Sequence, residues 1–314
     1  MLVQNFRPRV AVKLGIDYAT LSAINPRLVY AQISGYGEDG PMKDRSGQDL
    51  LVQSFTGLTM NAGLASGLPH PSPLYMVDVS ASHLASEGIL AALVARAATG
   101  KGQEVKVTMV AAIMEMQLQE LTSYMAADAP PVRSASPQVS IWMEPPYGVY
   151  ACAHGYLAIA QADLDVLADV IGAPDLKRLK VSRPAQSESA ALAAWRDEIY
   201  ETVQARLLGA DNSHWDALLS SHGLWCTVVN DYAEFLAHPQ TQRFLTTMTD
   251  LIAGAYRTVA PVVHFSDDPN PRLRSAPLYG ADTREILADA GFAESEIDGL
   301  IAGKAAIQRA ESVA

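Results

Sequence analysis

A helix, a glycine turn and a strand follow one another in the first third of the chain, and this succession constrains the fold most. Apolar and small residues recur at spacings of three and four over residues 79–98, which is typical of a helix packed on one face. The pattern stops at Gly100, and residues 104–109 then alternate polar and apolar, as a half-buried strand does. A second β-type run covers residues 28–34. Together these segments predict an α/β fold.

The rest of the chain predicts a second part with a different mixture of elements. A polar, proline-rich stretch from Asp128 to Pro137 indicates a connector. Beyond it, two alternating runs on either side of Ala153-His-Gly155 predict a hairpin over residues 146–160. The elements expected elsewhere are helices at 110–127, 163–172, 188–208 and 213–222, strands within Arg257–Phe265, and a helix-turn-helix near 282–303.

The charge balance and the cysteines limit what the chain binds and where it works. Its 314 residues carry 23 Lys and Arg against 34 Asp and Glu, a net charge of −11, which disfavours broad capture of nucleic acid or an anionic membrane. The two cysteines, Cys152 and Cys226, cannot form a disulfide framework, which fits a reducing compartment. The longest uncharged run, residues 50–77, is interrupted by prolines and glycines and cannot form a membrane-spanning helix. We therefore expect a cytoplasmic protein without a nucleic-acid or membrane partner.

Two glycine-rich segments superficially match phosphate-binding loops. Residues 35–40 read G-x-G-x-x-G after a strand, but Pro41 follows at once and no helix opens there, so a structural loop is favoured over a dinucleotide site. Gly100-Lys-Gly102 ends a helix and leads into a strand, the reverse of a P-loop, and is expected to be a plain turn. The seven histidines show no metal-ligand spacing, so no metal site is expected.

Asp78 is the acid with the most suggestive position, directly before the long helix. A carboxylate there faces the positive end of the helix dipole, and the free N–H groups of the first turn could stabilise an oxyanion. Spacing alone favours the simpler interpretation, an N-cap aspartate. A basic group of Arg7, Arg9, Lys13 and Arg27 could hold phosphates, although composition alone favours a solvated face.

Four groups of short segments keep a fixed order over nearly the whole chain. They are Gln4–Pro8 with Lys13–Gly15 and Ile24–Tyr30; Ser34–Pro41 with Arg45–Gln53 and Thr56–Leu58; Asp78 with Ile89–Leu93, Arg96 and Thr99–Gln103; and Ala276–Gly280 with Ile286–Leu287, Gly291–Phe292 and Glu296–Ile297. They resemble the E-N-F-R-P-G, S-G-F-G-x-x-G-P, T-G-x-G-Q and A-P-x-L-G segments of the class III coenzyme A transferases. That family includes formyl-CoA transferase, carnitine CoA-transferase and α-methylacyl-CoA racemase.

The resemblance implies a class III CoA-transferase fold that is α/β, with an incomplete Rossmann-like CoA-binding large domain and a smaller α+β domain. The expected boundaries are 1–143 for the large domain, 144–255 for the small domain and 256–314 for a segment returning to the large domain. Family members carry a further βαβ unit ahead of the first segment. Three explanations stay open: Met1 is not the native start, a second chain supplies that unit, or the protein is a remnant.

The resemblance also implies an activity, that of an acyl-CoA:carboxylate CoA-transferase. Asp78 would be the nucleophile and would carry an aspartyl-CoA thioester. The substrates would be an acyl-CoA and a carboxylic acid, with no tightly bound cofactor and no metal, in a homodimer. The residues that match the family's CoA-binding positions are Asn5, Phe6, Arg7, Lys13, Arg45, Ser46 and Gln48, with Asp49 close to the reacting centre.

Two departures from the family pattern bear on the activity. The family's racemases have a histidine at the position of Gln48, and an amide is no base near neutral pH, which favours transfer over racemisation. The stretch Ser134–Ser140 lacks the glycines of the loop that closes over the intermediate in transferases. A 2-methylacyl-CoA racemase or epimerase and a non-catalytic subunit remain the alternatives.

Overall fold

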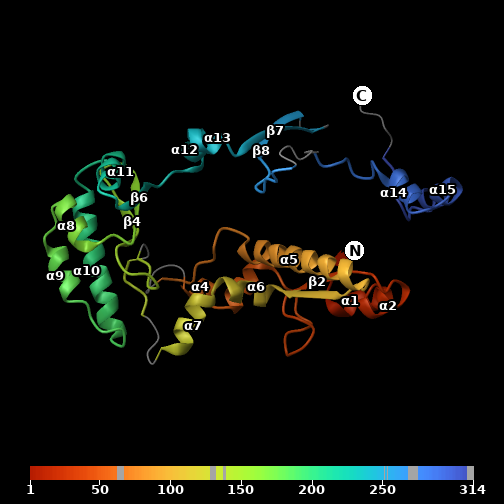
Figure 1. Ribbon diagram of the computed structural model, residues 1–314, viewed down its shortest axis with the longest axis horizontal. Helices are drawn as coiled ribbons and strands as arrows, with labels where there is room; N and C mark the ends of the chain where they lie inside the picture. The colour runs from red at the N-terminus through yellow and green to blue at the C-terminus, as the bar shows by residue number, and fades with distance from the viewer. Residues whose placement is uncertain are drawn as a thin grey trace. The chain divides into compact units, whose positions relative to one another are not determined.

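A three-stranded parallel sheet organises the N-terminal part of the chain, as the computed structural model shows (Figure 1). Its strands are β1 (Leu2–Gln4), β2 (Tyr30–Ser34) and β3 (Glu104–Thr108), in the order β1-β2-β3. The structure describes residues 1–61, 67–127, 132–136, 139–250, 252, 254–267 and 275–309. They form two compact units, Met1–Val229 and Asn230–Ala314, each of which is described by itself. The domain boundaries expected at 143/144 and 255/256 stay a prediction.

Helices connect the parallel strands, as the α/β prediction requires. Helices α1 (Pro8–Leu14) and α2 (Tyr18–Ile24) lie between β1 and β2; α3 (Asp49–Phe55), α4 (Leu58–Asn61) and α5 (Met76–Thr99) lie between β2 and β3; α6 (Met109–Met116) and α7 (Leu118–Ala126) follow β3. The single helix expected over 110–127 is therefore wrong in one respect, because it is interrupted at Gln117.

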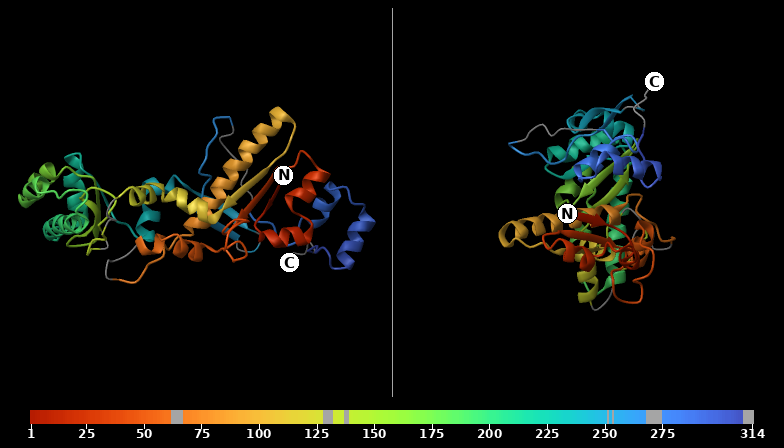
Figure 2. Two further views of the ribbon diagram at one scale, coloured as in Figure 1. Left: turned by 90° about the horizontal axis from the view of Figure 1, so that it is seen from below. Right: turned by 90° about the vertical axis from the view of Figure 1, so that its right-hand side faces the viewer.

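Helix α5 packs along β2 and β3, as Figure 2 shows. Gly88 makes the approach close, since a Cβ there would lie 2.6 Å from Val105 Cγ1. The helix ends where predicted, with Gly100 in the left-handed conformation at φ 72°. By length and composition alone α5 could cross a membrane, but this is weak evidence, because helices of soluble proteins pass the same test.

An antiparallel sheet and four helices complete the first unit. The strands β4 (Tyr147–Ala151), β5 (Tyr156–Ala160) and β6 (Trp225–Val228) pair in that order, and the helices are α8 (Leu164–Ile171), α9 (Asp175–Val181), α10 (Ser189–Leu207) and α11 (Asn212–Ser221). A core of buried residues that includes Leu157, Leu167 and Ile199 joins sheet and helices. The predicted hairpin and the helices matching α8, α10 and α11 are confirmed, whereas α9 and β6 were not predicted.

The second unit contains short elements. They are α12 (Tyr232–Ala237), α13 (Pro239–Gln242), the antiparallel pair β7 (Leu245–Asp250) and β8 (Gly254–Val259), α14 (Thr283–Asp289) and α15 (Glu294–Ala302). The helix-turn-helix near 282–303 is confirmed. The strand prediction over Arg257–Phe265 is wrong beyond Val259, where Pro261 cannot donate to a ladder.

Candidate functional site

A cavity of about 610 Å³ opens at the carboxyl ends of the three parallel strands. In such a sheet, the segments that follow the strands and the N-termini of the returning helices meet at one edge, where α/β proteins bind ligands. The lining accordingly comes from Asn5 to Pro8 after β1, from the segments around Gly35 and Arg45 after β2, from Asp78 to Ser82 on α5, and from Met109 after β3.

The structure brings most of the predicted site residues together around this cavity. Those that line it are Asn5, Phe6, Arg7, Arg45, Ser46, Gln48 and Asp78. Two others are placed differently. Lys13 lies exposed on α1 and does not line the cavity, and Asp49 is buried behind the lining, with 2% of its surface exposed.

Asp78 is not the N-cap of α5, so that interpretation is wrong. It is the third residue of the helix, whose N-cap position is Tyr75 and lacks a side-chain cap. The cap comes instead from α3, because Asp49 Oδ2 accepts from the backbone N–H groups of Val77 at 2.9 Å and of Asp78 at 3.2 Å. These two N–H groups are therefore occupied and are not the free oxyanion donors that the sequence suggested.

Asp49 is itself held by a second buried polar residue, Gln53. The Gln53 amide donates to Asp49 Oδ1, and its Oε1 accepts from the Ser72 backbone N–H at 2.9 Å. A buried carboxylate with its oxygens satisfied in this way is rigid. Asp49 therefore positions the first turn of α5, and with it Asp78, without lining the cavity.

Burial and the nearby charge of Asp49 both raise the pKa of Asp78, burial having the larger effect. A carboxylate with a raised pKa is more basic and therefore a better nucleophile once it is ionised. The side chain stays accessible, because Asp78 is an exposed residue on the cavity wall.

Three cationic residues share the cavity with Asp78: Arg7, Lys43 and Arg45. This arrangement suits a ligand with several phosphate charges. Sequence reasoning missed Lys43; its position two residues before Arg45, in the loop after β2, was the available signal.

The basic group expected from the sequence does not form as expected. Arg27 precedes β2 whereas Arg7 follows β1. Because the strands are parallel, Arg27 lies at their amino ends and Arg7 at their carboxyl ends. Arg27 Nη1 donates there to the Gly100 carbonyl at 3.2 Å, beyond the far end of α5. Arg9, like Lys13, is on α1 and does not line the cavity.

Close backbone contact between two loops shapes the cavity. A Cβ at Gly35 would lie 2.5 Å from Gly47 Cα, so neither position tolerates a side chain without a shift of the loop. The G-x-G-x-x-G segment that begins at Gly35 is confirmed as a loop, since the next helix starts only at Asp49. Gly100-Lys-Gly102 is likewise a turn between α5 and β3.

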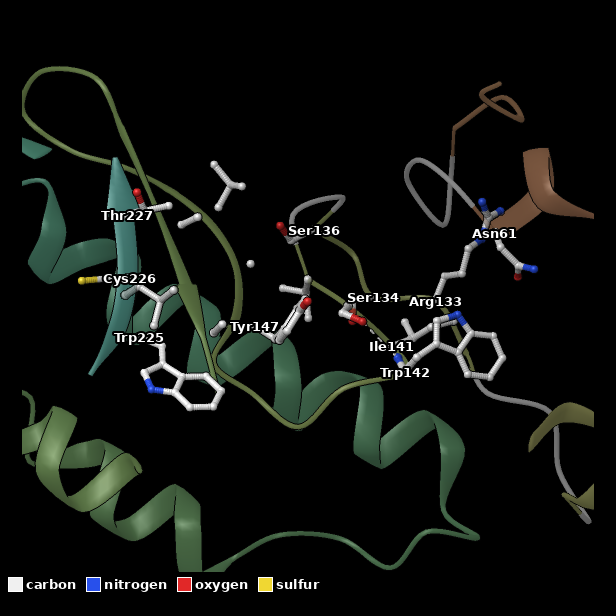
Figure 3. Close-up of a pocket in the computed structure, with 17 residues that line it drawn as sticks. Asn61, Arg133, Ser134, Ser136, Ile141, Trp142, Tyr147, Trp225, Cys226 and Thr227 are labelled. Atoms are coloured by element: carbon white, nitrogen blue, oxygen red, sulfur yellow. Dashed lines mark hydrogen bonds between the residues drawn. The ribbon is translucent and has the colours of Figure 1, made fainter. Parts of the chain in front are cut away.

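A larger cavity of about 800 Å³ lies between the connector and the antiparallel sheet. Figure 3 shows Arg133 and Trp142 toward one end and Trp225 on β6 at the other. Four residues of the glycine-free stretch 134–140 line this cavity and not the one with Asp78, namely Ser134, Ser136, Val139 and Ser140; residues 137 and 138 lie outside the described ranges. Because no carboxylate is among its described lining residues, the candidate chemistry belongs to the smaller cavity.

In the described part of the chain, no three His, Cys, Asp or Glu side chains are grouped so that they could hold a metal ion. The donor set of the Asp78 cavity is instead one carboxylate among cations and amides.

The fold is that of the class III coenzyme A transferases. The family described as CoA-transferase family III matches residues 1–283, and the chain belongs to it. It is 31% identical to an acetyl-CoA:oxalate CoA-transferase of Acetobacter aceti over 92% of this chain and 74% of that protein. It is 28% identical to an acyl-CoA transferase of Fusarium pseudograminearum over 96% of this chain and 67% of that protein.

Solved structures share the fold. A CaiB/BaiF family protein from Brucella suis superposes with a TM-score of 0.71 at 24% identity, covering 92% of this chain and 75% of that one. The expected fold and enzyme class are thus confirmed, and the chain spans about two thirds to three quarters of the length of these relatives.

Proposed function

We propose that the protein transfers CoA from an acyl-CoA to a carboxylic acid, with Asp78 as the nucleophile and an aspartyl-CoA thioester as the intermediate. The observation that carries this proposal is the composition of the cavity wall. Asp78 is the one carboxylate among its described lining residues, and it stands with Arg7, Lys43 and Arg45 at the ligand-binding edge of the sheet.

Each step exchanges one acyl bond for another. An Asp78 carboxylate oxygen attacks the thioester carbonyl, the carbon–sulfur bond breaks, and CoA thiolate leaves a mixed anhydride. The thiolate attacks Asp78 Cγ, the bond to the donor carboxylate breaks, and aspartyl-CoA forms. The acceptor carboxylate then displaces the thiolate to give a second anhydride. Attack of the thiolate on the acceptor carbonyl finally releases the new acyl-CoA and the free Asp78 carboxylate.

Two kinds of lining residue suit the two ends of CoA. Arg7, Lys43 and Arg45 offer charge to the nucleotide phosphates. Ser46 and Gln48 offer hydrogen bonds to the amides of the pantetheine arm on its way to Asp78. Lys13, which the resemblance assigned to CoA, has no place in this binding mode, since it does not line the cavity.

The same wall argues against racemisation. Gln48 lines the cavity together with Asp78, and its amide cannot accept a proton from a substrate carbon near neutral pH. Deuterium uptake at Cα of a 2-methylacyl-CoA in heavy water would contradict this conclusion.

Trapping of the aspartyl thioester tests the proposal. The protein is incubated with acetyl-CoA and oxalate, the substrates named for the Acetobacter relative, and with other acyl-CoA and acid pairs, in the presence of hydroxylamine. We expect mass spectrometry to locate a hydroxamate on Asp78 and on no other acid. Asp78→Asn should abolish the adduct and lower kcat by at least about a thousandfold.

The control is Asp44→Asn, because Asp44 is an exposed acid between Lys43 and Arg45 that does not itself line the cavity. Turnover without modification of Asp78 would overturn the proposed intermediate. Binding of CoA with neither turnover nor adduct, across the acid panel, would favour the non-catalytic alternative.

We also propose that the protein is a cytoplasmic homodimer. Large apolar side chains of the first unit lie open, among them Val94 at 72% and Met125 at 76% exposure, and a second copy would cover such residues. Both cysteines are free, which is compatible with a reducing compartment. Light scattering on the purified protein should give twice the chain mass; a monomer at micromolar concentration would contradict the dimer.

A further inference from the structure

A buried arginine whose Nε has no hydrogen-bond partner among the described residues lies far along the sequence from the Asp78 cavity. Arg196 belongs to α10, and only 5% of its surface is exposed. Its Nε has no hydrogen-bond partner, and no ion pair of its guanidinium is found within the described ranges. A buried charge of this kind is costly unless an anion compensates it.

Arg196 lines a small cavity of about 170 Å³ between α10 and the end of α7. Gln186 and Trp142 line the same cavity and carry side-chain N–H groups that can donate to an anion. Pockets for larger organic ligands usually measure roughly 300–1,000 Å³, so this one suits an anion of a few atoms and excludes CoA.

Among the described residues that line the cavity, one positive charge has no bonded carboxylate. Glu144 also lines it, but this carboxylate is engaged by Arg183, which donates from Nη2 to Oε1 at 2.6 Å and from Nε to Oε2 at 3.2 Å. The Arg183 guanidinium is further fixed over the Trp195 ring, 5.8 Å from its centroid. Two arginines thus share one carboxylate, and Arg196 is the one left without a bond to it.

Arg196 stays charged in this setting. Burial lowers its pKa, and Glu144 opposes that effect, but a guanidinium does not lose its proton in proteins. The buried site therefore holds a permanent cation.

We propose that this cavity is a second anion site, separate from the Asp78 cavity, in which Arg196 binds a small carboxylate. The flat Nε edge of a guanidinium pairs with the two oxygens of a carboxylate, and this geometry favours it over a point-like anion. A bound carboxylate would contact both Trp142, in the segment before β4, and α10, and would stabilise their contact. The proposal does not depend on catalysis by Asp78.

Calorimetric titration of the full chain with acetate, at constant ionic strength set by chloride, tests the site. Arg196→Met should weaken acetate binding by at least about tenfold, because the charge-assisted bonds are lost. Arg206→Met is the matched control, since Arg206 is exposed on the same helix. The affinity of this variant for acetate should stay within about twofold of that of the wild type. Arg45→Gln should also retain acetate binding, which separates this site from the Asp78 cavity.

Other outcomes overturn the proposal. Acetamide, which has the same shape without the charge, should not bind; if it binds like acetate, the site does not recognise an anion. Sulfate binding as tight as that of acetate would refute the carboxylate preference. Acetate affinity that is unchanged in Arg196→Met, or absent from the wild type, would refute the site.

A measurement on the wild-type protein covers the case in which Arg196→Met does not fold. Crystals soaked in 3-bromopropionate should show an anomalous bromine peak in the cavity beside Gln186 and Ser189. A cavity without bromine, in crystals where the compound is found elsewhere, would equally refute the site.

Discussion

At the scale of single residues, the two aspartates of the site have divided roles. Asp78 lines the cavity, whereas Asp49 is buried and accepts hydrogen bonds from the first turn of α5. The charge of Asp49 also contributes to the raised pKa of Asp78. The position of the candidate nucleophile, and part of its basicity, therefore depend on one neighbouring carboxylate.

This dependence gives a pH prediction. Attack requires ionised Asp78, so activity should be present above its pKa and be lost as the pH falls through it. Asp49→Asn removes the negative charge and lowers that pKa, so the acid limb of kcat/KM should move to lower pH. Burial, the larger cause, remains, and the limb should therefore move only part of the way. An unchanged acid limb in a folded Asp49→Asn protein would contradict this coupling.

The cationic residues of the cavity support a second prediction at this scale, which compares Arg45 with Arg27. Arg45→Gln should raise KM for acyl-CoA by about tenfold and leave kcat nearly unchanged, because a phosphate contact is lost equally in ground and transition states. Arg27→Gln, at the opposite edge of the sheet, should leave KM unchanged. Steady-state kinetics with both variants measure the two KM values. Equal KM values would show that Arg45 does not contact the acyl-CoA.

The sequence could indicate most of the candidate site, but not how its residues are held. Asn5, Arg7, Arg45, Gln48 and Asp78 were recognisable because short motifs contain them. The capping of α5 by Asp49 of α3 could not be recognised, since a cap that comes from another helix leaves no local sequence pattern. The sequence also did not show that Lys13 lies outside the cavity lining, because a position on a helix does not tell which face meets a cavity.

At the scale of elements, α5 and β3 were predictable because helix, glycine cap and strand each have a strong local signal. The break between α6 and α7 at Gln117 was not predictable, since the apolar pattern continues across it. Short helices such as α3 and α9 were missed because seven residues give too few turns for a period to stand out.

The contact of α5 with the sheet supports an element-scale prediction. Gly88→Ala should destabilise the protein by about 1–3 kcal/mol, because the new methyl group would overlap with Val105, although alanine favours helix by about 1 kcal/mol. Denaturant unfolding measures the change. The double variant Gly88→Ala/Val105→Ala should be less destabilised than the sum of its single variants, and strict additivity would contradict the overlap.

At the scale of the whole molecule, the two units differ in how much core they possess. The first contains an extensive buried cluster from the antiparallel sheet and its helices and a second cluster beside the site. Among the described residues from Asn230 onward, only Thr241 and Ile297 are buried. A unit with so little buried apolar surface is weakly stabilised by its own contacts.

Hydrogen exchange should reveal this difference. Backbone amides of β5 and α10 should be protected up to the global free energy of unfolding, whereas those of β7, β8 and α14 should exchange at least about a hundredfold faster. Mass spectrometry of peptic peptides gives both rates in one experiment. Equal protection would show that contacts beyond those within the second unit stabilise it.

The capping of α5 by Asp49 has a consequence for anyone who alters this enzyme. Residues 45–48, which border the cavity, continue directly into Asp49, so the recognition loop and the anchor of the nucleophile are one continuous piece of backbone. Substitutions that retune substrate choice in this loop will therefore disturb reactivity as well. Engineering of new specificities should start at Phe6, which follows β1 and lines the cavity outside this loop, so that the reacting carboxylate keeps its support.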